Sequence, residues 1–226
     1  MWDPAVTELP PFDPATAPAD PLALFTAWFA EAVAAGQTEP HTMSLATAGE
    51  DGLPDVRTVM LHGADASGWS FATHVDSRKG RQLTARPYAA LGFYWPAQGR
   101  QVRVRGPVSA APAQDGQADL HARSTGALAA ALTGRQSQVL GSLEELARAS
   151  ESAWERAGRE PDAPVPTWTL YQLRPDEVEF FQGDARRRHV PRLPARGGWL
   201  GEGAALAVGP GGRCQSVGVS RGGGSR

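Results

Sequence analysis

The stretch Ser77–Gly106 reads SRKGRQLTARPYAALGFYWPAQGRQVRVRG, and it joins a basic turn, a short amphipathic run and two β-rich runs. The turn contains Lys79, the single lysine in a chain with 22 lysines and arginines. The lysine ammonium is a compact charge on a flexible side chain, whereas the arginine guanidinium is a rigid fork of donors. In a chain that otherwise uses arginine, a single lysine therefore indicates a site that the guanidinium fork does not fit. With Arg78 and Arg81 beside it, the turn predicts a phosphate site. The alternative is that Lys79 is a solvated residue at a helix end and has no specific role.

The residues around this turn predict a helix held against a sheet. Ser77 is a helix cap, Leu83 faces inward, and Pro87 ends the helix at Arg86. Strands are expected over 88–95 and 100–110. In the second strand valines alternate with polar and cationic residues, which are Gln101, Arg103 and Arg105. This alternation is typical of an antiparallel sheet with one solvated, cationic face.

The rest of the chain predicts a mostly β fold with peripheral helices. Asp20 and Pro21 open a helix that ends at Gly36, and period-two runs at 43–48, 56–61 and 69–74 predict a three-stranded meander. Residues 114–157 have helical patterns, and two further strands are expected on either side of a tight Pro175–Asp176 turn. A closed or partly open barrel would remove the exposed edges of these strands.

Length and composition predict the domain organisation. The chain of 226 residues predicts a mobile Pro-rich arm at 1–20, one folded domain at 21–200 and a Gly-rich tail at 201–226, which is expected to be disordered because it has almost no periodic apolar pattern. A net charge of -2 gives no electrostatic argument for a nucleic-acid partner. The N-terminus has no leader pattern and no long apolar run occurs, so a cytoplasmic protein without a membrane partner is expected.

Metal chemistry is not expected. The single cysteine, Cys214, excludes a disulfide or a thiolate cluster within one chain. His41, His74 and His121 lack the spacing of metal ligands, so we expect them to be structural or exposed.

Several ordered motifs resemble the pyridoxamine 5'-phosphate oxidases, which are flavin-dependent proteins. The similarity runs from Asp20 to about Trp199. It rests on RTVML at 57–61, FAT at 71–73, SRKG at 77–80, FYW at 93–95, RQVRVRG at 100–106, RQS at 135–137 and EFFQG at 179–183. The resemblance implies an FMN-binding split β-barrel of Greek-key type and a homodimer with FMN in a groove between two identical subunits.

The resemblance assigns twelve residues to FMN. Arg78 and Lys79 would hold the phosphate, and strand residues would line the flavin. The full set is Arg57, Val59, Met60, Leu61, Ala72, Thr73, Arg78, Lys79, Gln101, Gln136, Ser137 and Phe181. Some of these contacts would come from the second subunit. Phe181 stands where the family has a tryptophan, and Pro191 stands where it has an arginine, with Arg192 as a possible substitute.

The substrate site departs from the family pattern. The family has lysine, tyrosine and serine where this chain has His62, Asp119 and Ala127, while Arg123 is retained. Asp119 would repel a phosphorylated substrate. His62 could equally be a surface residue at a strand end. Arg187 and His189 match the family's catalytic pair, although a solvated basic turn is the alternative for His189.

Two classes of function follow from this resemblance. The first is an FMN-dependent oxidase that passes electrons from a small-molecule substrate to molecular oxygen, with pyridoxine or pyridoxamine 5'-phosphate as the default substrate. Because the pocket is altered, a dihydro-aromatic intermediate of the phenazine-pathway kind is a rival substrate. The second class is a non-catalytic flavin-binding protein on the same barrel.

Overall fold

The computed structural model describes residues 9, 12–13, 16–183, 205–208 and 214–217. Its helices are α1 Pro21–Ala34, α2 Arg78–Ala85, α3 Ala113–His121, α4 Thr125–Thr133 and α5 Leu143–Arg159, with a 3₁₀ turn at Pro96–Gln98. Its strands are β1 Thr42–Ala48, β2 Pro54–Met60, β3 Gly63–Asp65, β4 Gly68–His74, β5 Tyr88–Trp95, β6 Arg100–Ala110, β7 Trp168–Leu173, β8 Glu177–Gln182, β9 Ala205–Val208 and β10 Cys214–Val217.

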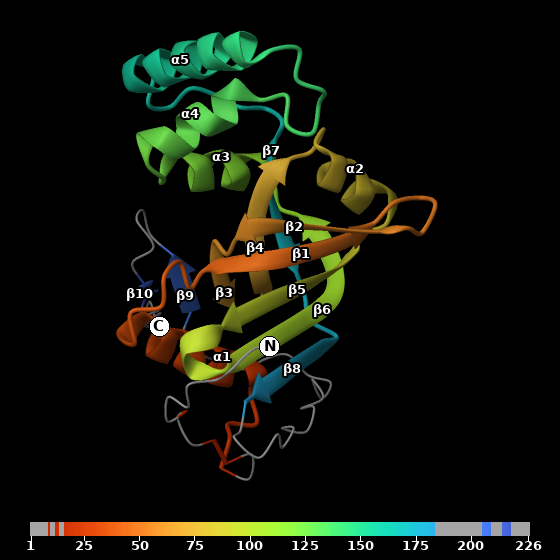
Figure 1. The fold of residues 1–226 in the computed structure, drawn as a ribbon, viewed down its shortest axis with the longest axis vertical. Helices are drawn as coiled ribbons and strands as arrows, with labels where there is room; N and C mark the ends of the chain where they lie inside the picture. The colour runs from red at the N-terminus through yellow and green to blue at the C-terminus, as the bar shows by residue number, and fades with distance from the viewer. Residues whose placement is uncertain (1–8, 10–11, 14–15, 184–204, 209–213, 218–226) are drawn as a thin grey trace, which may run out of the picture.

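All the strands pair antiparallel in one strongly curved sheet (Figure 1). The strand order is β10-β9-β3-β4-β7-β6-β5-β1-β2, and β8 also pairs with β6. The mostly β fold with peripheral helices is therefore confirmed. The three-stranded meander is wrong, because β1 pairs with β2 and β5, whereas β4 pairs with β3 and β7. The segment expected to be a simple turn contains β3, which forms a hairpin with β4.

The long strand β6 connects the two halves of the barrel. Its residues 100–105 pair with β8, and its residues 108–110 pair with β7. The predicted Pro175–Asp176 turn is thus a corner between β7 and β8, which both lie along β6. Gly106 is required at this corner, since a Cβ atom there would lie 1.9 Å from the carbonyl oxygen of Arg174. The split of the barrel therefore depends on this close backbone approach.

Helix α1 closes one end of the barrel, as Figure 1 shows. Asp20 caps the helix by accepting a 3.0 Å hydrogen bond from the backbone N–H of Leu22, as predicted. Phe25 is fully buried and packs against the rings of Trp69 and Phe93 at centroid distances of 5.4 and 5.0 Å. Burial of such rings supplies much of the hydrophobic stabilisation of a small core.

Helices α3, α4 and α5 gather at the opposite end of the barrel (Figure 1). They enclose a second, smaller core that includes Leu120, Leu128, Ala131 and Ala157. The loop between α4 and α5 leaves this helical layer and reaches α2, where residues 136 and 137 contact residues 78 and 79. The helical layer therefore contributes directly to the predicted phosphate site.

Two short strands lie in the Gly-rich tail. Strand β9 pairs with β3, and β10 pairs with β9. The sequence did not predict these two strands. An unpaired edge such as that of β3 can recruit a strand through main-chain hydrogen bonds, without an apolar pattern in the recruited segment. The predicted arm at 1–20 lies mostly outside the described residues.

Candidate functional site

The basic turn forms the centre of a polar cluster at the start of α2. Lys79 is only 8% exposed, and its Nζ donates a 2.6 Å hydrogen bond to Oε1 of Gln136. Thr73 Oγ1 donates to the same oxygen at 3.0 Å. The backbone N–H of Arg78 donates to Ser137 Oγ at 3.2 Å. The structure thus brings together five of the predicted cofactor residues when Thr73 is included.

Arg57 lies at the same place and is held by β1, β2 and α2. Its guanidinium donates to Thr47 Oγ1 at 2.6 Å and to Gln82 Oε1 at 2.9 Å. Asp55 forms ion pairs with Arg57 at 2.9 Å and with Arg78 at 3.0 Å. Sequence reasoning missed Asp55 and Gln82. The available signal was the period of two on β2, which places Asp55 and Arg57 on one face of the strand.

The charges of this cluster do not balance. Burial and, to a smaller extent, the charge of Arg57 lower the pKa of Lys79 to about 8, although Asp55 opposes both effects. Burial alone would raise the pKa of Asp55, but Arg57, Gln82 and Arg78 together hold it below its usual range. Three cations therefore face one carboxylate, leaving two uncompensated positive charges. Two N–H groups of the Lys79 ammonium also have no acceptor among the described residues.

This cluster fits a phosphate group. A phosphate carries a charge of about -1.5 to -2 near neutral pH and accepts several charge-assisted hydrogen bonds. The positive end of the α2 helix dipole adds to this charge, because Ser77 caps the helix and its first turn follows directly. The phosphate of FMN would be held here by Arg57, Arg78 and Lys79.

The strand residues assigned to the flavin differ in accessibility. Met60 is 49% exposed, Val59 and Ala72 are half-buried, and Leu61 is fully buried in the barrel core. The side chain of Leu61 therefore cannot line a cofactor, and any contact from this residue would be made by its backbone. Backbone groups of Leu61 are partly engaged, since its N–H donates to the carbonyl oxygen of His41 at 2.8 Å.

Gln101 and Phe181 lie in another part of the sheet. They face each other on β6 and β8, and Tyr94 on β5 is the other neighbour of Gln101. Three strand steps separate β6 from β2, which is about 14 Å at the usual strand spacing. One copy of the chain therefore presents the predicted cofactor residues as two groups. Arg187 and His189 lie outside the described residues.

The three predicted substrate residues form one network. His62 Nδ1 lies 2.9 Å from both carboxylate oxygens of Asp119. Arg123 contacts the same carboxylate through Nη2 at 3.0 Å and Nε at 3.3 Å. His62 lies two residues after the end of β2, Asp119 lies in the last turn of α3, and Arg123 follows just after that helix. Their i,i+4 spacing could have predicted the second contact but not the first.

Burial and pairing set the charges of this network. Burial lowers the pKa of His62, and Asp119 opposes this effect without overcoming it. Burial alone would raise the pKa of Asp119, but hydrogen bonds from His62 and Arg123 lower it to about 2. Near neutral pH the network therefore contains a neutral imidazole and one compensated ion pair. Its net charge is zero, in contrast to the cluster around Lys79.

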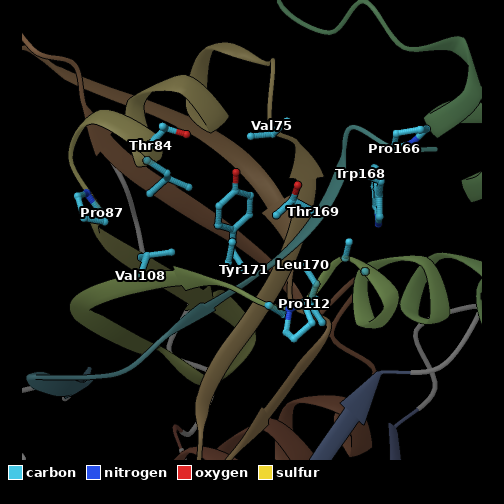
Figure 2. Close-up of a pocket in the computed structure, with 15 residues that line it drawn as sticks. Val75, Thr84, Pro87, Val108, Pro112, Pro166, Trp168, Thr169, Leu170 and Tyr171 are labelled. Atoms are coloured by element: carbon cyan, nitrogen blue, oxygen red, sulfur yellow. The ribbon is translucent and has the colours of Figure 1, made fainter.

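A separate cavity of about 340 Å³ lies between α2, α3 and β7. Figure 2 shows the ring of Tyr171 and the side chains of Trp168 and Val108 in its wall. The lining residues include no charged side chain, so this cavity does not match the predicted phosphate site. In the described part of the chain, no group of three or more histidine, cysteine, aspartate or glutamate residues could hold a metal ion. Likewise, no helix described there is long and apolar enough to cross a membrane.

A curved antiparallel sheet with a few peripheral helices is the architecture of the split-barrel class of proteins. Residues 29–157 match the family model described as pyridoxamine 5'-phosphate oxidase. The chain belongs to the pyridoxamine 5'-phosphate oxidase family. The pyridoxine/pyridoxamine 5'-phosphate oxidase of Burkholderia multivorans is 44% identical over 177 residues, which cover 78% of this chain and 82% of that protein. The one of Pseudomonas fluorescens is 42% identical, covering 77% and 82%.

Solved structures support the same fold. PhzG from Burkholderia lata, in complex with tetrahydrophenazine-1-carboxylic acid, matches with a TM-score of 0.73 at 25% identity, covering 92% of this chain and 98% of that one. An FMN-binding protein of Nostoc punctiforme, related to pyridoxamine 5'-phosphate oxidase, matches with a TM-score of 0.59 at 20% identity, covering 88% and 98%. The split-barrel prediction is therefore confirmed.

Proposed function

We propose that this protein is an FMN-dependent oxidase of the pyridoxamine 5'-phosphate oxidase type. The observation that carries the proposal is the cationic cluster of Arg57, Arg78 and Lys79, in which two positive charges are uncompensated. Family membership supports the same conclusion. When bound, FMN would supply hydride acceptance from the substrate and electron transfer to molecular oxygen, with release of hydrogen peroxide.

The residues of this chain would bind and orient the cofactor. Lys79 would donate to the phosphate through the two N–H groups that Gln136 does not use. Gln136 would keep the ammonium in place, because its amide oxygen accepts from Lys79 and is itself held by the hydroxyl of Thr73. Asp55 would prevent Arg57 and Arg78 from repelling each other before the phosphate arrives. The site would thus be partly organised in advance, which lowers the cost of binding.

A second copy of the chain would complete the site. The outer face of the sheet exposes Val56, Met60, Tyr88 and Tyr94, which are 45–65% accessible in one copy. Tyr94 lies directly beside Gln101, in the group of predicted cofactor residues remote from Lys79. A homodimer that covers this apolar face would bury large side chains and bring Gln101 and Phe181 of one subunit toward the phosphate cluster of the other.

Two substrate classes follow, each with its own support. The relatives named pyridoxine/pyridoxamine 5'-phosphate oxidase, at 42–44% identity, favour those phosphorylated pyridines. The neutral His62–Asp119–Arg123 network favours a substrate without phosphate, of the reduced aromatic kind bound in the PhzG structure.

The test starts from the purified protein and its visible absorption spectrum. We expect a yellow protein whose flavin, after photoreduction, is reoxidised by oxygen. Turnover is then followed as hydrogen peroxide release with pyridoxine 5'-phosphate, pyridoxamine 5'-phosphate and dihydro-aromatic carboxylic acids. A colourless protein that added FMN does not change would contradict the proposal. A yellow protein that turns over none of these substrates would instead support a non-catalytic flavin carrier.

A further inference from the structure

We propose that His62, Asp119 and Arg123 form a charge-neutral subsite that recognises an uncharged N–H or O–H donor of the substrate in place of a phosphate. This inference rests on the proposed function, because it concerns the substrate of the same site. It assigns His62 as the group that touches the substrate. Asp119 is a positioning residue, since it acts through His62 and Arg123.

The first step concerns the charge of Arg123. Its guanidinium contacts the Asp119 carboxylate through two nitrogens, and the exposed fractions of the two side chains are only 17% and 15%. An ion pair at this distance and depth neutralises most of the field that an incoming anion would feel. A phosphate dianion would have to displace Asp119 from Arg123 and leave a shielded carboxylate beside it. The subsite therefore disfavours a phosphate.

The second step concerns the orientation of His62. Because Nδ1 faces both carboxylate oxygens at 2.9 Å, Nδ1 carries the ring proton, and this N–H donates a hydrogen bond to Asp119. The ring is neutral near pH 7, since burial lowers its pKa. Nε2 consequently has a free lone pair. Nε2 has no hydrogen-bond partner within the described residues, and it is not among the buried atoms sealed from solvent.

The third step concerns the neighbouring charges. His41 lies close enough to influence His62, and burial lowers its pKa too, so it adds no cation near pH 7. Its Nδ1 is buried and lacks a partner among the described residues. Glu39, which influences His41, adds negative charge. Among the described residues of this neighbourhood, no other cation replaces the positive charge of Arg123 that Asp119 neutralises.

The chemistry of Nε2 defines the ligand class. A neutral imidazole nitrogen with a lone pair accepts a hydrogen bond from an N–H or O–H group and repels another acceptor. A partly reduced nitrogen heterocycle or a phenol-like ring offers such a donor. The ester phosphate of a vitamin B6 compound offers only acceptors once it is fully ionised. The subsite thus selects for the donor rather than for negative charge.

The test uses the FMN-loaded protein and two unreactive probes, 4-deoxypyridoxine and its 5'-phosphate. Isothermal titration calorimetry measures both affinities. In the wild type we expect the phosphate to change the affinity less than about threefold. Asp119→Asn keeps the shape but releases the charge of Arg123, so the phosphorylated probe should bind about ten- to a hundredfold more tightly, and the other probe within about threefold of wild type. Asp115→Asn makes the same change at an exposed position of α3 and should alter neither affinity.

A second measurement reports on His62 independently of any ligand. Nitrogen-15 NMR of the histidine rings should show Nδ1 protonated and Nε2 unprotonated in His62, and Asp119→Asn should weaken this preference. The proposal is overturned if the wild type binds the phosphorylated probe at least tenfold more tightly, if a folded Asp119→Asn protein gains no affinity for it, or if Nδ1 is unprotonated. Failure of FMN itself to bind would contradict the proposed function instead, and the NMR result would still decide the tautomer.

Discussion

Replacing Lys79 with alanine tests the phosphate site most directly. The substitution removes one of three clustered cations and the ammonium that donates to Gln136. A charge-assisted contact to a shielded anion is worth about 1.5–3 kcal/mol, which is about ten- to a hundredfold in affinity for FMN. The apoprotein should not be destabilised, because burial and Arg57 already disfavour the charged lysine. We therefore expect weaker cofactor binding without a lower melting temperature.

Arg81→Ala is the matched control for this experiment. Arg81 is exposed on the same helix, and its side chain donates to the backbone carbonyl of Asp76. Exposed cations contribute little, so FMN affinity should fall less than about threefold. Quenching of FMN fluorescence on titration with apoprotein measures all three dissociation constants. Equal and small losses in Lys79→Ala and Arg81→Ala would refute the phosphate site and identify Lys79 as a residue of no special role.

Three further predictions concern pH, assembly and substrate. FMN affinity should stay constant between about pH 6, where the phosphate gains its second charge, and about pH 8, the lowered pKa of free Lys79. Above pH 8 it should weaken by up to about tenfold per pH unit. Lys79→Arg should bind FMN more weakly, because the fork does not fit the site, but its affinity should not fall further above pH 8. The wild type should be a dimer by light scattering. Tyr94→Asp places a charge on the exposed sheet face and should give monomers. A wild-type monomer at micromolar concentration would contradict a site shared between two subunits. In the wild type, His62 and Asp119 should lower kcat/KM for pyridoxine 5'-phosphate by about two to four orders of magnitude. The double variant His62→Lys with Asp119→Tyr should therefore raise it. A wild-type value of about 10⁴ M⁻¹s⁻¹ or more would show that the pocket still serves that substrate.

The sequence predicted the elements whose signals are local. Ser77 caps α2, Pro87 ends it, and the alternation along β6 places Val102 inside and Arg103 outside, because each depends on side chains within a few positions. The lone lysine was likewise found from composition. Its partner Gln136 was reached only through family resemblance, since a separation of 57 positions leaves no local pattern.

The sequence could not predict which strands pair. The runs at 43–48, 56–61 and 69–74 have similar alternation, and nothing in them distinguishes a meander from strands that lie in different halves of the barrel. The outcome depends on β3, three residues long, and on the close approach of Gly106 to Arg174. Such features are decided by tertiary packing, where local propensity is a weak guide.

The contacts among the substrate residues were only partly predictable from the sequence. Asp119 was expected to oppose a substrate phosphate, and the structure adds that it contacts His62 and Arg123 at the same time. Alone, a buried carboxylate would be costly, and each partner lowers that cost. The replacement of the family's lysine by His62 and of its tyrosine by Asp119 can thus be understood as one linked change. His62 without Asp119 would lose its carboxylate partner, and Asp119 without His62 would keep only Arg123.

The two clusters differ in how their charges balance, and this difference bears on which ligand carries a phosphate. Around Lys79 three cations meet one carboxylate, so the cluster gains stability when an anion binds. Around Asp119 the formal charges of Asp119 and Arg123 cancel, so an anion there gains little and must break existing hydrogen bonds. If both inferences are correct, one phosphate binds per site and it belongs to the cofactor. The substrate is then selected by hydrogen bonding to His62. This explains how the chain can keep the cofactor motifs of the family while the residues of its substrate pocket differ.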